Sequence, residues 1–560
     1  MKKLIGALIA SLLLSGAAAT SPTYGITGDY LSNLSLTEGQ WLVLAAEQSR
    51  DGIHSQLAIQ PGSVEVGGKR GDWYMCSGID DPTCSTTLAL KDIIAWSMLP
   101  DCSATSNEIC IESFKIGTTT SDLAAATYAA EADERYDFKG DPSKNLLDGR
   151  GVPVYTTGEM KNTLGTNQFA VMVRPTSFWD AKTKKFYLHS LEAEILPYVL
   201  SNSGNGACLF GLENQCARPA GFLNGTVVEL TFRIPNTLGG WFSGRMKDPV
   251  ISVTPYSSTA NLVTIKSEPV EVAALGLVKE KASFTPIENM WVENNGRWQT
   301  NGGTATGANG WQENIFPFIE NYRPQVNDTA IGTDLVWKMR TIDAGPGSGC
   351  LADKSQVLGI VTTNALGYDI GSPSFNGGYL EYKVAGLHYM PNGVDLVIGS
   401  YDLIMRSETA RCLYGFTKAP VSATVNVLGT GDQNIATTIV SEKDGWLKLA
   451  AYGFTFSEKE IKVKLTQPFT KTITKFSGTT KSLSSKQKTE IKATVAKAKS
   501  NPKFICTGTY VNPSSKATAL ARARSACNYA KSLDKNHSYF AQAKQTSASS
   551  YDAKVMISSK

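Results

Sequence analysis

Histidine is scarce in this chain of 560 residues, which has only four. They are His54, His189, His388 and His537, far apart in the sequence and without any Cys-x2-Cys pair, so a zinc site is not indicated. The Gly-x-Ser-x-Gly, His-Glu-x-x-His and P-loop motifs are missing as well. We therefore expect a protein with no enzymatic activity, no cofactor and no metal ion, and we expect no nucleic-acid partner.

Long apolar runs are also missing beyond the first twenty residues, so we expect no transmembrane segment in the mature chain. At the start, Lys2 and Lys3 precede an apolar run over residues 4–14, and Ala17-Ala18-Ala19 fits a small-residue cleavage site. The alternative, a membrane anchor, is disfavoured because the run is short for a bilayer core of ~30 Å. Residues 1–19 are therefore predicted to be a signal peptide, and the protein is predicted to be secreted, extracellular or associated with the cell wall.

Cysteine, by contrast, is plentiful, with ten in the chain. In an exported protein this number favours disulfide bonds over metal sites. Three neighbouring pairs each enclose seven residues, a spacing that suits hairpins and surface excursions. The other four complete a pairing in which each cysteine bonds the next one along the chain. The five expected disulfides are Cys76–Cys84, Cys102–Cys110, Cys208–Cys216, Cys350–Cys412 and Cys506–Cys527.

Acidic residues are nearly missing from the last ninety positions. Residues 471–560 contain 17 Lys and Arg but only Glu490, Asp534 and Asp552, a net charge of +14. Because the whole chain is only +4 and the signal peptide holds two lysines, residues 20–470 carry a net −12. The near-neutral net charge of the whole chain is thus the sum of an acidic body and a basic tail. Such a tail favours polyanionic partners.

Runs of β-forming residues separated by Gly, Pro and Asn dominate the chain up to residue 468, for example at 169–174 and 226–234. An Ala-rich stretch at 121–135 favours a helix instead. We expect a multidomain, mainly β protein built of β-sandwich-like modules and ending in a C-terminal α/β sandwich. The expected domains are 20–280 with a helical insertion near 121–135, 281–420, a small module of Ig-like scale at 421–468, and a basic domain at 471–560.

The basic domain is predicted to have the order β-α-β-α-β. The expected strands lie at 472–476, 504–507 and 554–557, and the expected helices lie at 486–499 and 516–533. This order resembles the OmpA-like peptidoglycan-binding domain over about residues 470–560. The resemblance is carried by Phe476 and Leu483 before a basic helix, by Phe504-Ile-Cys-Thr-Gly508, by Leu520-Ala-Arg-Ala-Arg-Ser525 and by Lys554-Val-Met-Ile557.

The resemblance implies a site for the diaminopimelate residue of the peptidoglycan stem peptide. In that family an Asp after the second strand and an Arg on the following helix hold the two ends of this residue. Arg524 matches the Arg, with Arg522 as the second choice, whereas Thr509-Tyr510-Val511 stand where the Asp is expected. The chain also resembles modular β-rich exported proteins of Gram-positive actinobacteria.

The body offers weaker candidates for chemistry. Trp291, Trp298 and Trp311 lie among Asn and Gly residues and are either a stacking platform for sugars or buried indoles that pin loops. Glu192 and Glu194 point to one face of a likely strand and are a possible carboxylate pair for glycoside hydrolysis. The loop containing Asp137, Asp141 and Asp148 either holds Ca²⁺ or is simply solvated, and we favour the latter.

Taken together, these patterns favour a secreted, non-enzymatic protein of the cell envelope. Its C-terminal domain is expected to bind peptidoglycan or an anionic wall polymer, and its β-rich body is displayed for adhesion to a glycan or surface protein. The alternative is a secreted carbohydrate-binding protein, or an enzyme acting on glycosides, with the glycan site in the body.

Overall fold

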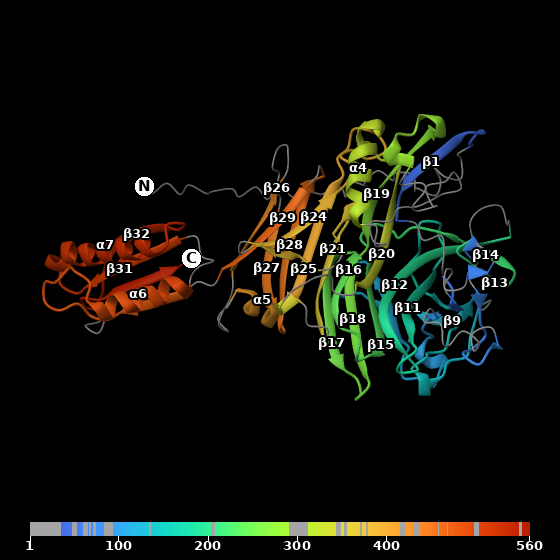
Figure 1. Ribbon diagram of the computed structural model, residues 1–560, viewed down its shortest axis with the longest axis horizontal. Helices are drawn as coiled ribbons and strands as arrows, with labels where there is room; N and C mark the ends of the chain where they lie inside the picture. The colour runs from blue at the N-terminus through green and yellow to red at the C-terminus, as the bar shows by residue number, and fades with distance from the viewer. Residues whose placement is uncertain are drawn as a thin grey trace, which may run out of the picture.

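The computed structural model describes most of the chain between residues 35 and 559, and strands far outnumber helices in it (Figure 1). The expected signal peptide lies outside the described residues. Among the described residues we find no helix with the length and apolar character that a membrane crossing requires. The described ranges are 35–47, 53–59, 65–66, 69–70, 74–82, 93–133, 136–202, 208–289, 312–342, 349–351, 356–369, 372–376, 379–414, 422–428, 437–456, 459–466, 469–497, 503–547 and 552–559.

A central sheet organises the body. It is built outward from the long hairpin of β11 (Gln168–Asp180) and β12 (Lys185–Ser201). The strands pair antiparallel, except that β16 and β21 run parallel. From β12 the order continues as β20 (Gly332–Ile342), β16 (Gly240–Arg245), β21 (Val357–Thr363), β25 (Ile398–Arg406), β28 (Trp446–Thr455) and β27 (Thr437–Lys443).

The ladders of this sheet cross both boundaries expected inside the body. β20, from the expected 281–420 domain, lies between β12 and β16 of the 20–280 domain. β28, from the expected 421–468 module, pairs with β25. The expected boundaries at 280 and 420 are therefore wrong, because one sheet runs through both of them. Alternating side chains identify a strand but carry no information about which distant strand it pairs with.

Two smaller sheets cover opposite faces of the central sheet. On β21 and β25, Ile360 and Ile404 enter one core, whereas their neighbours Val361 and Leu403 enter another. Successive side chains of a strand point to opposite faces, so these strands are buried from both sides. One covering sheet has the order β17 (Lys247–Pro255), β18 (Ala260–Glu268), β15 (Val227–Pro235), β7 (Ile111–Gly117) and β8 (Ala124–Ala125). The other has the order β22 (Gly367–Tyr368), β24 (Tyr379–Ala385), β29 (Lys459–Thr466) and β26 (Ser422–Leu428), with β23 (Ser374–Asn376) paired to β24.

Most of the remaining strands of the body extend the central sheet, whereas β3 and β4 pair only with each other. The strands are β1 (Gln40–Ala45), β2 (Gln56–Ile59), β3 (Glu65–Val66), β4 (Lys69–Arg70), β5 (Tyr74–Met75), β6 (Ile93–Trp96), β13 (Phe210–Leu212), β14 (Gln215–Pro219) and β19 (Val270–Glu280). The helices are α4 (Gln312–Tyr322) and α5 (Ser407–Tyr414).

The helix expected near 121–135 is absent from this described segment, which forms strands instead. β9 (Thr127–Ala132) pairs with β10 (Val152–Thr156), and the Tyr128 ring packs 5.9 Å from that of Tyr155. The prediction was wrong because the preference of alanine for helices is worth well under ~1 kcal/mol per residue. Cross-strand pairing and the burial of alternate side chains outweigh such a preference.

The C-terminal residues fold as an α/β unit around their own core, drawn in orange to red in Figure 1. The two expected helices start within one residue of their expected positions, and β32, which we did not expect, lies parallel to β31 at the edge of the sheet. The sheet order is β30-β33-β31-β32. The elements are β30 (Phe469–Ile473), α6 (Ser485–Lys497), β31 (Lys503–Tyr510), α7 (Lys516–Leu533), β32 (Ser538–Gln545) and β33 (Val555–Ser559).

Helix α7 packs very closely on strand β31. A Cβ atom at Gly508 would lie 1.9 Å from the carbonyl oxygen of Ala519, so only glycine allows this approach. The disulfide Cys506–Cys527 joins the same two elements, with 5.8 Å between the Cα atoms. The unit is therefore fixed at its centre by one covalent link and one close backbone contact.

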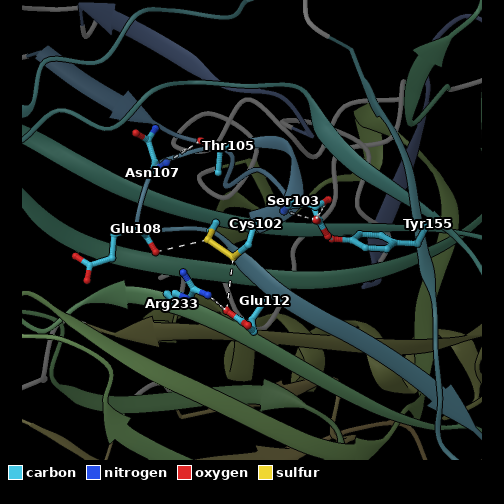
Figure 2. Close-up of a disulfide and its surroundings, with 10 residues drawn as sticks. Cys102, Ser103, Thr105, Asn107, Glu108, Glu112, Tyr155 and Arg233 are labelled. Carbon is cyan, nitrogen blue, oxygen red and sulfur yellow. Dashed lines mark hydrogen bonds and ion pairs between the residues drawn. A yellow bond between two sulfur atoms is a disulfide. The ribbon is translucent and has the colours of Figure 1, made fainter.

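Four of the five expected disulfides are present: Cys102–Cys110, Cys208–Cys216, Cys350–Cys412 and Cys506–Cys527. Cys76 is also disulfide-bonded, and its expected partner Cys84 lies outside the described residues. Figure 2 shows how Cys102–Cys110 closes a short excursion before β7. Tyr155 donates a hydrogen bond to Asp101 (2.8 Å), which tethers this excursion to β10.

Candidate functional site

The surface of the C-terminal unit is strongly basic. Twelve Lys and Arg side chains of its described residues are exposed to solvent. They come from both helices, from the strands and from the connecting turns, so positive charge surrounds the unit. These residues are Lys471, Lys475, Lys481, Lys486, Lys488, Lys492, Lys503, Lys516, Arg524, Lys531, Lys535 and Lys544.

The three acids of this unit do little to cancel that charge. Glu490 accepts a hydrogen bond from the Thr474 backbone amide at 2.7 Å, and this bonding helps to hold the pKa of Glu490 below its ordinary value despite the opposing effect of burial. Asp534 accepts from the Asn536 amide at 2.9 Å, and its other oxygen lies 3.3 Å from His537 Nδ1. The three carboxylates are far fewer than the twelve exposed cations, so the surface of the unit keeps a large positive charge.

The two arginines expected to bind the wall have different environments. Arg522 is 4% exposed, and its guanidinium donates to the carbonyl oxygens of Thr480 (2.8 Å) and Gly478 and lies over the Phe476 ring. It fixes the turn that precedes α6. Arg524 is two positions further along α7, about 200° around the helix axis, and is exposed. Arg524 is therefore the arginine that α7 presents to a ligand.

An acid that sequence reasoning missed lies beside the end of β31. Asp552 Oδ1 accepts a hydrogen bond from the Val511 amide at 3.1 Å, and Thr509 is buried, with its hydroxyl 3.2 Å from the Lys554 carbonyl oxygen. Burial lowers the pKa of Arg522, and the negative charge of Asp552 opposes that effect, so the two groups are neighbours. Asp552 is far from Gly508 in sequence, and only the pairing of β31 with β33 brings it to this end of the sheet.

Glu192 and Glu194 are neutralised by basic side chains on neighbouring strands of the body. Glu192 lies between Arg174 on β11 (2.9 Å) and Arg340 on β20 (3.6 Å), and Glu194 lies 3.6 Å from Lys338. Although burial raises the pKa of Glu192, the two arginines outweigh burial and hold it below its ordinary value. A general acid for glycoside cleavage needs a raised pKa, so this pair does not fit that chemistry.

The other candidates of the body are three tryptophans and the acids of the expected calcium loop. Trp291, Trp298 and Trp311 lie outside the described residues. Asp141 accepts from the Ser143 amide (2.9 Å) and Asp148 accepts from the Gly140 amide (2.8 Å), so backbone donors occupy these carboxylates. Among the described residues, we find no group of three or more His, Cys, Asp or Glu side chains arranged to hold a metal ion.

One open cavity of about 610 Å³ is present in the body. Glu131 and Asp133 line it from one side, and the β13–β14 hairpin with the Cys208–Cys216 disulfide lines it from the other. Glu131 is already paired with Arg150, whose Nη2 lies 3.0 Å away. The only aromatic side chain in the lining, Phe210, is buried, so the cavity does not present the exposed ring face that a sugar requires.

Comparisons of the chain with protein-family models, with curated proteins and with solved structures gave no match.

Proposed function

We propose that this protein is an exported, non-enzymatic component of the cell envelope. Its C-terminal unit binds peptidoglycan or an anionic wall polymer, and its β-rich body is displayed for adhesion. The observation that carries the proposal is the shell of twelve exposed cations on a unit with only three acidic residues. The disulfides support export, because such bonds persist in oxidising compartments.

We expect ion pairs between the exposed Lys and Arg side chains and the wall polymer to set the strength of this attachment. Each exposed ion pair contributes about 1 kcal/mol or less, and salt screens it over ~10 Å at 0.1 M. Many weak contacts with a repeating polyanion add up to retention that is reversible and sensitive to salt. We also propose that Arg524, which is exposed on α7, supplies the guanidinium that a stem-peptide diaminopimelate needs.

The first prediction tests the cationic shell on the full chain. Replacing Lys486, Lys488 and Lys492 of α6 with Gln removes three exposed charges. Because Lys488 lies 5.7 Å from the Tyr529 ring, thermal unfolding checks that the variant keeps its fold. We expect the variant to elute from purified sacculi and from teichoic acid columns at clearly lower salt than the parent protein, because fewer counter-charges hold it. Pull-down across a salt series measures this.

The matched control replaces Lys182, Lys184 and Lys185, which are exposed in the body, with Gln. Elution at the parent salt concentration is expected for this control. If both triple variants elute at the same salt, binding does not reside in the C-terminal unit. A soluble stem peptide added as competitor tests the finer proposal, and Arg524→Gln should weaken that competition.

A further inference from the structure

A buried carboxyl group in the body lies against a lysine from the neighbouring strand. Asp402 on β25 is 0% exposed, and its Oδ1 lies 3.4 Å from Nζ of Lys448 on β28. In the β25–β28 register Asp402 pairs with Ala450, so Lys448 is its diagonal neighbour on the same face. The Lys448 side chain is itself only 15% exposed, so water is largely excluded from between the two groups.

Every other contact of this cluster fits the formation of an amide bond. The Asp248 backbone amide donates to Asp402 Oδ2 at 3.2 Å, and the Tyr452 hydroxyl donates to Asp402 Oδ1 at 2.5 Å. The Asp248 carboxylate contacts Lys448 Nζ directly. The carboxyl carbon of Asp402 is therefore surrounded by a nucleophile in Lys448, a proton acceptor in the Asp248 carboxylate and an oxyanion donor in the Asp248 amide. The Tyr452 hydroxyl contacts Oδ1, the oxygen that would leave.

The backbone at Asp248 is held in an unusual conformation to make these contacts. Its φ is +53°, in the left-handed region, and it lies in a register irregularity between Lys247 and Val250 of the β17–β18 ladder. Non-glycine residues in this region cost free energy and concentrate at functional positions. The irregularity brings both the amide and the carboxylate of Asp248 to the Asp402–Lys448 pair.

We propose that Lys448 and Asp402 are joined by an intramolecular isopeptide bond, which the folded chain forms by itself with the loss of one water molecule. The Lys448 ammonium gives one proton to the Asp248 carboxylate, and the resulting amine attacks Cγ of protonated Asp402. Negative charge then collects on Oδ2, which the Asp248 amide stabilises. Oδ1 departs as water with its own proton and a second proton from the nitrogen, and Asp248 later releases the first proton to solvent.

The protonation state of Asp402 agrees with this chemistry. Burial raises the pKa of Asp402 to about 6, although Lys448 and Tyr452 act in the opposite direction. Near neutral pH a minor fraction of Asp402 therefore carries the proton that the attack requires, a larger fraction than for an ordinary Asp. The resulting bond would cross-link β25 and β28 covalently beside their hydrogen-bond ladder.

Trypsin digestion of the reduced and alkylated full-length protein, followed by mass spectrometry, tests the proposal. A linked Lys448 resists cleavage, so we expect a branched peptide joining residues 384–406 to residues 444–459, lighter by one water than its two parts. Recovery of separate peptides 384–406, 444–448 and 449–459, without the branched species, would overturn the proposal.

The structure offers an internal control and two informative variants. Lys338 lies 3.6 Å from Glu194 and is similarly buried, but no cross-link is proposed for it, so cleavage after it should be complete. Lys448→Arg keeps the positive charge but cannot form the amide, so the branched peptide should disappear. Asp248→Asn keeps the amide and tolerates the backbone conformation, so the cross-link should form several-fold more slowly. If the cross-link forms at an unchanged rate in Asp248→Asn, the Asp248 carboxylate takes no part in the reaction.

Discussion

Individual buried charges decide much of how this body is held together. The ion pair of Arg245 with Glu47 is the clearest case, since both side chains are 0% exposed and 2.6 Å separates Nη2 from Oε1. Arg245 also donates to the carbonyl oxygens of Thr363 and Leu366, each at 3.1 Å, and lies 4.4 Å from the Tyr368 ring. One guanidinium therefore joins the end of β21 to the segment that follows β1.

Replacing Glu47 with Gln is expected to destabilise the body strongly. The substitution leaves the Arg245 charge buried without its counter-charge, and breaking a buried pair in this way costs about 3–5 kcal/mol. Denaturant unfolding measures the change. The matched control is Glu229→Gln at the Lys115–Glu229 pair, whose side chains are 40% and 19% exposed respectively, where a loss below about 1 kcal/mol is expected. Equal losses in the two variants would contradict this account.

At the scale of elements, close packing of a helix on a strand defines the C-terminal unit. Gly508 on β31 faces the backbone of α7, and the disulfide Cys506–Cys527 lies beside this contact. The sequence showed a glycine at the end of a strand, which is ordinary turn chemistry. Its role in helix–strand contact became visible only from the position of Ala519.

The Gly508→Ala substitution is therefore expected to force α7 away from the sheet. Overpacking of this kind costs about 1–3 kcal/mol, and more when the obstacle is backbone, as it is here. Thermal unfolding of the full chain measures it. Gly158→Ala serves as the control, because nothing lies within 4 Å of a Cβ built there, and its effect should stay within about 0.5 kcal/mol. A similar shift from both changes would show that the α7–β31 contact is not tight.

On the scale of the whole molecule, the chain combines a multilayered β body with a smaller basic unit that has its own core. The two parts carry opposite net charges, −12 for residues 20–470 against +14 for residues 471–560. A body that repels polyanions and a unit that attracts them favour one orientation on an anionic wall.

Separate cores predict two thermal transitions in scanning calorimetry of the full-length protein. Glu47→Gln should lower only the transition of the body, and Gly508→Ala should lower only that of the C-terminal unit, because no hydrophobic cluster of the described residues spans the two. A single transition that both substitutions move would mean that the two units unfold as one.

The sequence predicted correctly those features that depend on residues close together in the chain. Sequential pairing predicted the four described disulfides, of which Cys102–Cys110 and Cys208–Cys216 close short loops that leave few other partners within reach. The α7 helix was predicted over its full length, because its alanine and leucine spacing acts within one element. The helix at 121–135 failed because a weak local preference met a strong non-local pairing.

Composition and order along the chain thus determined the mainly β character, the local disulfides and the division of charge between the body and its tail. Tertiary structure alone decided that one sheet runs through the expected domains, that Arg522 is buried while Arg524 is exposed, and that Asp552 lies at the end of β31. It also brought Asp248, Asp402 and Lys448 together from three distant strands. The physical reason is that strand pairing links residues irrespective of their separation in sequence, and neither periodicity nor composition records the partner.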